Sequence, residues 1–312
     1  MRIIALILGC ALAGATFAQG YPNRPLQMFH GFLVGGNPDI ISRLIAPALG
    51  ERLGQTVVVE PRPGASGRIA TAHVAKQPAD GYTMIMITGG DAVLAATARD
   101  LPYDLLRDLA FASSTTRFPF LFAVAADSPY KTLRDLIEDA RKRPGKLTYG
   151  TSGIASTLHL AGELFKDMAG IDLLHVPFKG EQVREIVAGR LDLAVTVATP
   201  AMALIKAGKV RVLAHTGPDR LADLPEAQPI REELPGYEVL SWLGLALPGG
   251  TPAAIVERVS AELRAVLARE DVKTRLLSLG SEPYPATPAE FRARVEADVA
   301  KWKKLAAKVK LD

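Results

Sequence analysis

Two short stretches of the sequence combine glycine with small polar residues in a way that suits the binding of an anion. The first spans residues 35–39 (Gly-Gly-Asn-Pro-Asp), and the second spans residues 151–156 (Thr-Ser-Gly-Ile-Ala-Ser). An apolar pattern of helical period follows each stretch, so each is expected to open a helix. The first amides of a helix lack partners within it, and its dipole places partial positive charge there. We therefore predict a small organic anion, held at one carboxylate by amides of residues 35–37 and 152–156.

Each stretch also has a simpler interpretation. Glycines can form a tight turn between a strand and a helix without any ligand. Asn37 is a plausible N-cap for a helix that has Pro38 as its first residue, and Ser156 is a plausible N-cap for the second helix. Capping alone would therefore account for several of these residues.

Side chains close to the two stretches supply further candidates. The charge of Asp39 would oppose an anion, so we expect its carboxylate to bond the amides of its own turn. Thr88 ends an apolar strand and could contribute a hydroxyl to the wall of the site. His159 lies one turn into the second helix, where it either makes structural hydrogen bonds or contacts the ligand. Lys179 either adds positive charge to the site or is simply solvated.

Glu181 could influence which anion binds. If its carboxylate faces the site, it would repel a second ligand carboxylate and favour a monoacid or an amino-acid-like anion. If it faces solvent, it is an ordinary acidic residue near a helix N-terminus. The complete set of predicted ligand-binding residues is Phe32, Gly35, Gly36, Asn37, Asp39, Thr88, Ser152, Gly153, Ser156, His159, Lys179 and Glu181.

The sequence lacks the recurrent motifs of enzymes and metal sites. Ser152 and His159 could suggest a nucleophile and a base, but no Gly-x-Ser-x-Gly elbow surrounds the serine. There is no His-Glu-x-x-His, no phosphate-binding Gly-x4-Gly-Lys, and no Gly-x-Gly-x-x-Gly after the first expected strand. The five histidines have no metal-ligand spacing, and Cys10 is the single cysteine. We expect no catalytic residues, metal or cofactor, with a hydrolase that uses Ser152 and His159 as a remote alternative.

Strands and helices are expected to alternate along the chain, which predicts an α/β fold with mostly parallel sheets and helices on both faces. Such sheets bind ligands at the carboxyl ends of their strands, where both polar stretches lie. Pro47, inside the first helical pattern, predicts a kink or an early end. The expected strands are 26–32, 57–60, 82–88, 118–126, 147–149, 172–176, 191–197, 210–215 and 241–247. The expected helices are 38–53, 67–76, 133–143, 156–169, 180–188, 200–206, 252–268, 271–279 and one that begins at 288.

The first residues have the pattern of a secretory leader. A positive residue, Arg2, precedes an apolar run to Phe17, and a small-x-small pattern predicts cleavage after Ala18. Lipoprotein processing at Cys10 is a weaker alternative, because few residues precede that cysteine. The 312 residues are 48% hydrophobic and 22% charged with a net charge of +4, so we expect a globular protein of about two domains that does not bind nucleic acid.

Many short motifs, in the same order along the chain, resemble the solute receptors of tripartite tricarboxylate transporters, which are also called TctC or Bug proteins. None of these motifs is decisive alone, but together they cover the whole chain after the leader. The motifs are Tyr21-Pro-Asn-Arg-Pro25, Gly35-Gly36-x-x-Asp39, Arg62-Pro-Gly-Ala65, Pro78-x-Asp-Gly-Tyr-Thr83, Leu101-Pro-Tyr-Asp104, His159-Leu-Ala-Gly-Glu-Leu-Phe165, His175-Val-Pro-Phe-Lys-Gly180 and Pro248-x-Gly-Thr-Pro252.

The resemblance implies a type II periplasmic-binding-protein fold, in which two α/β domains are joined by two crossing strands and close on a ligand. The first domain would comprise residues 21–122 plus 241–312, and the second residues 123–240. The resemblance further implies a periplasmic receptor, expected to be monomeric, that delivers a small organic acid to membrane transporter subunits. A receptor that presents its ligand to a membrane sensor kinase is an alternative.

Four positions depart from the family pattern. Gly31 stands in place of a usual proline, and Pro61 in place of a common asparagine. Ile154-Ala155 replace an Asn-Gly pair, and Glu181-Gln182 stand where small residues are usual. Because the last two changes lie near the expected ligand, the substrate of the family cannot be transferred to this chain.

Overall fold

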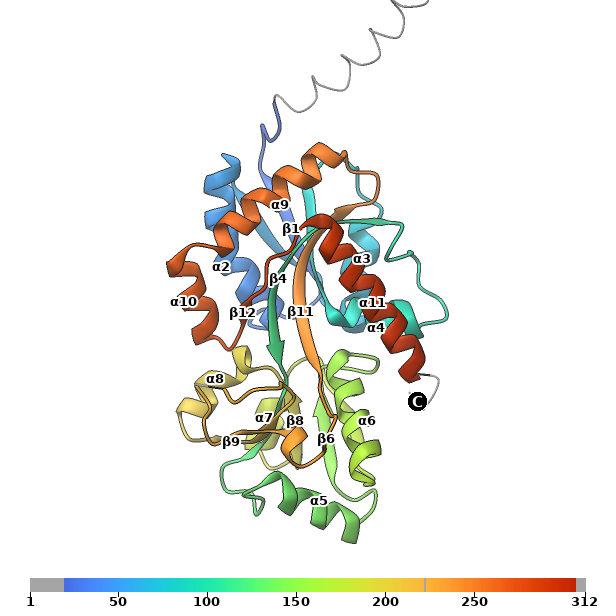
Figure 1. Cartoon of the computed structure of the whole chain (residues 1–312), viewed down its shortest axis with the longest axis vertical. Coiled ribbons are helices and arrows are strands. Elements are labelled where there is room, and N and C mark those ends of the chain that lie inside the picture. Colours follow the sequence, from blue (N-terminus) through green and yellow to red (C-terminus); the bar gives the residue numbers. More distant parts are fainter. Residues whose placement is uncertain (1–19, 222, 307–312) are drawn as a thin grey trace, which may run out of the picture.

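Two six-stranded sheets organise the part of the chain that the computed structural model describes, residues 20–221 and 223–306. The first sheet has the order β12-β4-β11-β3-β1-β2, and the second has the order β10-β9-β5-β8-β6-β7. The sheets lie in two lobes stacked end to end, which we call the upper and the lower lobe as drawn in Figure 1. The strands are β1 (Leu26–His30), β2 (Val57–Pro61), β3 (Thr83–Thr88), β4 (Leu109–Pro119), β5 (Leu121–Ala125), β6 (Thr148–Thr151), β7 (Leu174–Pro177), β8 (Leu193–Thr196), β9 (Val210–His215), β10 (Gln228–Pro229), β11 (Leu240–Pro248) and β12 (Glu282–Pro283).

Helices cover the sheets of both lobes, as expected for an α/β protein. Strand β1 pairs in parallel with β2 and β3, and β6 pairs in parallel with β7 and β8. Strand β3 is buried along its whole length because α2 and α3 both pack against it. The helices are α2 (Asn37–Leu53), α3 (Arg68–Val74), α4 (Gly89–Thr97), α5 (Leu133–Lys142), α6 (Thr157–Ala169), α7 (Gln182–Val187), α8 (Ala198–Lys206), α9 (Ala253–Leu267), α10 (Glu270–Ser278) and α11 (Pro288–Ala306), with short 3-10 turns at Ala65–Gly67 and Ile230–Glu232.

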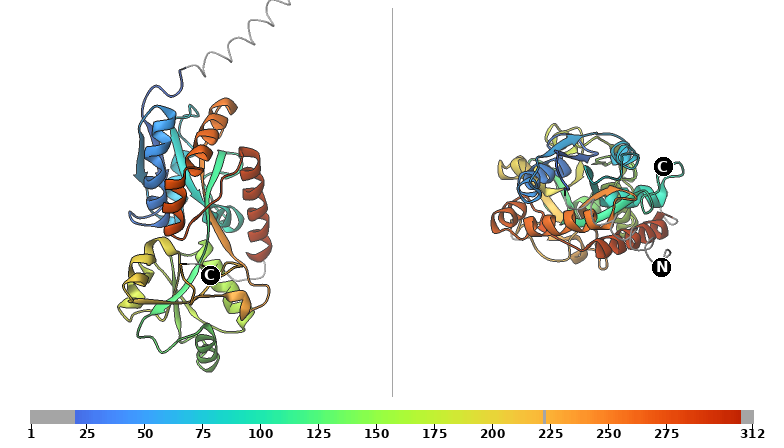
Figure 2. Two further views of the ribbon diagram at one scale, coloured as in Figure 1. Left: turned by 60° about the vertical axis from the view of Figure 1, so that its left-hand side comes forward. Right: turned by 90° about the horizontal axis from the view of Figure 1, so that it is seen from above.

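The chain passes between the lobes along two neighbouring segments, and Figure 1 and the left-hand view of Figure 2 show long strands there. It leaves the first sheet at the end of β4, crosses at Phe120 and enters β5; it returns at the start of β11, where Leu240 pairs with Pro119. The predicted single strand at 118–126 is therefore two strands, one in each sheet.

Thr216 ties these two crossing segments together. Its N–H donates to the Phe120 carbonyl (2.9 Å), and the Phe120 N–H donates to its hydroxyl oxygen (2.8 Å). On the other segment, the Val239 N–H donates to the Thr216 carbonyl (3.1 Å), and the Thr216 hydroxyl donates to the Val239 carbonyl. Thr216 is fully buried, so these bonds are shielded from water.

Helix α2 differs from the sequence-based expectation at two residues. The helix does not end early at Pro47 but continues to Leu53, where Gly54 adopts a positive φ of 77° and terminates it. Pro47 is exposed, whereas Ile45 and Leu49 beside it are fully buried, so their packing offsets the missing backbone bond. The N-cap is Gly36 and not Asn37, because the Asn37 side chain is bonded to the other lobe instead.

Candidate functional site

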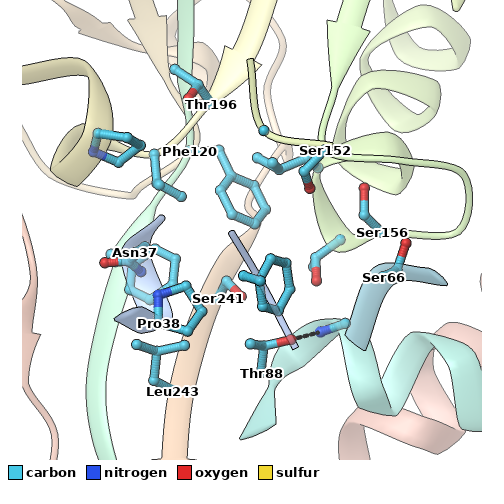
Figure 3. Close-up of a pocket in the computed structure, with 18 of the residues that line it drawn as sticks. Asn37, Pro38, Ser66, Thr88, Phe120, Ser152, Ser156, Thr196, Ser241 and Leu243 are labelled. Carbon is cyan, nitrogen blue, oxygen red and sulfur yellow. Dashed lines mark hydrogen bonds between the residues drawn. The ribbon is translucent and has the colours of Figure 1, made fainter. Parts of the chain in front are cut away.

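A cavity of about 90 Å³ lies between the two lobes, near the ends of β3 and β8 (Figure 3). Both lobes line it, and the two crossing segments contribute Phe118, Phe120 and Ser241. Within the described part of the chain, the residues that line this cavity include no charged side chain. Hydroxyl groups are common instead, and they belong to Ser66, Thr88, Ser152, Ser156, Thr157, Thr196 and Ser241.

Among the described residues, five helices begin at this cavity. The upper lobe contributes the starts of α2 and α4, and the lower lobe the starts of α6, α7 and α8. Across the boundary between the lobes, α2 packs against α8, and α4 packs against α6. The sequence predicted the starts of α2 and α6 as the anion site. The structure adds the start of α4, which was not predicted as a helix, and the starts of α7 and α8.

The two pairs of helix starts differ in whether a hydrogen bond already joins them across the cleft. In the pair α2 and α8, Pro38 and Pro200 carry no N–H, and the Asn37 carboxamide oxygen accepts a bond from the Thr199 hydroxyl (2.7 Å). Among the described residues no hydrogen bond joins the start of α4 to the start of α6. The amides of Thr157 and Leu158, the first two residues of α6, have no acceptor within the helix. The α4 and α6 pair is therefore better suited to hold a carboxylate.

Helix α4 begins with a complete capping box. The Thr88 hydroxyl accepts the Gly90 N–H (3.0 Å), and the Asp91 carboxylate accepts the Thr88 N–H (2.8 Å). Asp91 is buried and also accepts a bond from Thr71, and its burial raises its pKa. Thr88 lines the cavity as expected, but it has the additional role of fixing the start of α4.

The glycine turn before α2 uses most of its amides internally. The Gly35 N–H donates to the Asp39 carboxylate (3.0 Å), and the Gly36 N–H donates to the Leu33 carbonyl (3.0 Å). Asp39 thus bonds a turn amide as expected, and its carboxylate also accepts from His30 and Arg43. Neither glycine lines the cavity, so of the residues predicted here only Phe32 and Asn37 reach it.

A second, larger cavity of about 440 Å³ lies at the mouth of the cleft. It is lined by Phe32 and Ser152, which also line the inner cavity, and by Gly153 and the exposed Lys179. The Ser66 hydroxyl of the upper lobe donates to the Ile154 carbonyl of the lower lobe here (3.1 Å). Gly153, with φ of 135°, permits this close approach of the two lobes.

The Glu181 carboxylate forms a hydrogen bond within its own loop. It accepts the backbone N–H of Lys179 (3.0 Å), and Glu181 is not among the residues that line either cavity. The next residue, Gln182, lines the inner cavity instead, although the sequence-based prediction did not include it. The sequence did contain an indication of this role, because Gln182 stands where the family usually has a small residue.

His159 is buried and its side chain contacts other residues of the lower lobe. Its Nδ1 accepts the Ala155 N–H (3.2 Å), and its ring stacks on His175 with centroids 3.9 Å apart. Burial lowers the pKa of His159, so the ring is neutral near pH 7. Among the described residues no hydrogen bond joins Ser152 to His159, so the geometry of a nucleophile and base is not formed.

The histidine pair predicts an acid-sensitive fold. Burial, together with the neighbouring His159 and Lys166, lowers the pKa of His175 to about 3. An unfolded histidine titrates near pH 6.5, so the contribution of His175 to the free energy of unfolding is complete above that pH. This contribution falls as acidification protonates the unfolded chain. At pH 5 this single residue should lower the free energy of unfolding by about 1–2 kcal/mol relative to pH 7.

The free energy of unfolding, measured in urea, should fall between pH 7 and pH 5 in both the wild type and His175→Gln. We expect the fall to be smaller in His175→Gln, by about 1–2 kcal/mol. Glutamine can retain a bond to the Thr151 hydroxyl, which lies 2.8 Å from His175 Nε2. The control is the interval above pH 7, where His175 is neutral in both the folded and the unfolded chain, so the two proteins should respond equally to pH. Equal pH dependence in the wild type and His175→Gln would contradict the assignment.

The described helices include none long and apolar enough to cross a membrane. Two α/β lobes, two crossing segments and a cleft between them define the class of two-lobed solute-binding proteins. The chain belongs to the tripartite tricarboxylate transporter family receptors, whose family model matches residues 41–311. The resemblance drawn from the sequence motifs is thus confirmed, and members of this TctC and Bug family are periplasmic binding proteins.

Three solved structures illustrate the similarity. The R. palustris protein Rpa4515 with adipate is 37% identical with a TM-score of 0.89, and the match covers 93% of this chain and 99% of that one. The periplasmic binding protein BugD is 29% identical with a TM-score of 0.88, covering 94% and 99%. MatC from Rhodopseudomonas palustris with bound malate is 27% identical with a TM-score of 0.85, covering 91% and 99%.

Proposed function

We propose that this protein is a periplasmic receptor that binds a small organic carboxylate in the cleft between its lobes. The observation that carries the proposal is the pairing of the α4 and α6 starts across a cavity that no charged side chain lines within the described part of the chain. Amides at these helix starts can neutralise one carboxylate without an arginine or lysine. The neutral residues around them exclude water, which strengthens each hydrogen bond to the anion.

The ligands of similar proteins support the same chemical class. The structures of Rpa4515 and MatC contain adipate and malate, which are both small carboxylates. Phe32, Asn37, Thr88, Ser152 and Ser156, all predicted as binding residues, line the cavity and form the core of the proposed site. Lys179 and Gly153 would act at the mouth of the cleft.

Delivery to the membrane subunits of a tripartite transporter is the second part of the proposal, with the protein acting as a monomer. Export to the periplasm would use the leader at residues 1–18, which lies outside the described residues, as does Cys10. The alternative is that the closed receptor signals to a membrane sensor kinase. Genes for a large and a small membrane subunit beside the receptor gene would favour transport.

Closure would move two domains, residues 21–122 plus 241–312 and residues 123–240, about the crossings at Phe120 and Leu240. Ligand binding stabilises whichever arrangement it binds best, so the right acid should populate the closed form. Small-angle scattering should then record compaction, and no change with a tightly bound acid would remove hinge closure from the proposal.

A screen of organic acids tests the proposed function. We expect at least one small carboxylate to raise the melting temperature and to give a saturable isotherm in calorimetry. NMR of the recovered acid should find it chemically unchanged. If no carboxylate binds, or if the bound acid is converted to a product, the proposal of a non-catalytic carboxylate receptor is wrong.

A further inference from the structure

Two buried polar atoms at the lower-lobe side of the inner cavity have no hydrogen-bond partner among the described residues. They are Oε1 of Gln182 and Oγ1 of Thr196, in side chains whose residues are 3% and 1% exposed. Both residues line the cavity. Figure 3 draws Thr196 across the cavity from Thr88 and Pro38. Ten buried side-chain atoms lack a partner among the described residues, and only Gln182 and Thr196 of their residues line this cavity. Buried polar atoms in folded proteins nearly always have partners, so this pair points to a group supplied by the ligand.

The orientation of the Gln182 amide determines what that group must be. Its Nε2 donates to the Val195 carbonyl (3.3 Å), and the reverse orientation would set two oxygen atoms against each other. Its Oε1 is therefore an acceptor only, and it requires a donor. A ligand carboxylate cannot supply one and would be repelled. Thr196 can either donate or accept, so it is compatible with the same donor group.

The absence of charge around the described cavity discriminates between the two common donors. An ammonium group would be buried beside a neutral amide with no carboxylate in the cavity lining, which is unfavourable. Glu181, the nearest acidic residue in sequence, bonds its own loop. A hydroxyl carries no charge and can both donate to Gln182 and exchange a bond with Thr196.

We propose that Gln182 and Thr196 recognise a hydroxyl group on the ligand, so that this receptor prefers a hydroxycarboxylate. The inference rests on the proposed function, because it takes the carboxylate to lie at the starts of α4 and α6. Since Gln182 stands where small residues are usual in the family, it is a feature of this chain.

Calorimetry with matched acids tests this selectivity. The probes are succinate, malate and aspartate, and also butyrate with 3-hydroxybutyrate and 4-hydroxybutyrate. We expect the wild type to bind a hydroxy acid about tenfold or more tightly than its counterpart without the hydroxyl, and more tightly than the amino acid. Gln182→Met and Thr196→Val, which are close in size to the original residues, should each reduce that preference.

Glu181→Gln is the control and should leave the preference unchanged. Melting temperatures of all variants establish that they are folded, and the two substitutions provide independent readings if one misfolds. Three outcomes would overturn this inference and leave the proposed function intact. They are equal binding of acids with and without the hydroxyl, a preference for aspartate, and a preference for the hydroxy acid that survives both substitutions. If none of these acids binds but another carboxylate of the screen does, the inference is wrong and the proposed function stands. If no carboxylate of the screen binds the wild type, both fail.

Discussion

Replacing Ser156 by aspartate is expected to weaken carboxylate binding by about 100-fold or more. Ser156 is the N-cap of α6 and lines the cavity, so the substitution places a negative charge beside the amides of Thr157 and Leu158. Two like charges about 4 Å apart in a partly buried site repel by about 4 kcal/mol at an effective dielectric constant near 20. The effect is large because no charged side chain lines this described cavity to offset it.

The fold should tolerate this substitution. Aspartate is a good N-cap and can accept the His159 N–H as Ser156 does (3.1 Å). It loses the bond from the Ser156 hydroxyl to the Gly153 carbonyl, but its charge is favoured by the helix dipole. The melting temperature without ligand should therefore stay close to that of the wild type.

Ser156→Asn is the matched neutral variant, and it can both accept from His159 and donate to Gly153. We expect it to bind the acid within about tenfold of the wild type. The measurement is calorimetry with whichever acid binds the wild type. Equal affinity of Ser156→Asp and Ser156→Asn would mean that the ligand carboxylate is not held at the start of α6.

The largest effect on stability is expected from Thr216→Val. Valine has nearly the same shape, but it removes the hydroxyl that accepts the Phe120 N–H and donates to the Val239 carbonyl. Both backbone groups would then be buried without a partner, at a cost of about 1–3 kcal/mol each. We expect the free energy of unfolding, measured in urea, to fall by about 2–6 kcal/mol.

Thr216→Ser retains the hydroxyl and separates this effect from packing. It should cost only about 1 kcal/mol for the lost methyl group. Because Thr216 joins both crossing segments, the valine variant should also change the compaction that scattering records on ligand binding. If the valine and serine variants are equally stable, the hydroxyl does not hold the crossings together.

Local patterns in the sequence were sufficient for the fold class and for the starts of several helices. The alternation of strands and helices predicted both α/β lobes, and Ser156 caps α6 as its position suggested. Prediction was less successful where packing overrides local preference. Pro47 is accommodated within α2 by its buried neighbours, and Gly89-Gly90 begins α4 because the Thr88 and Asp91 capping box fixes that start.

The arrangement of the site depended on contacts between residues far apart in the sequence. Nothing near Asn37 indicates that its side chain meets Thr199 of the other lobe, or that α4 and not α2 faces α6. Gln182 and Thr196 come together at the cavity only because α7 and β8 are neighbours in the lower lobe. The sequence by itself determined the helix starts near Asn37 and Thr157, since the turn residues and apolar patterns that set a helix start are local properties. The tertiary structure alone decided which helix starts face each other, because that depends on how the two lobes pack about the crossing segments.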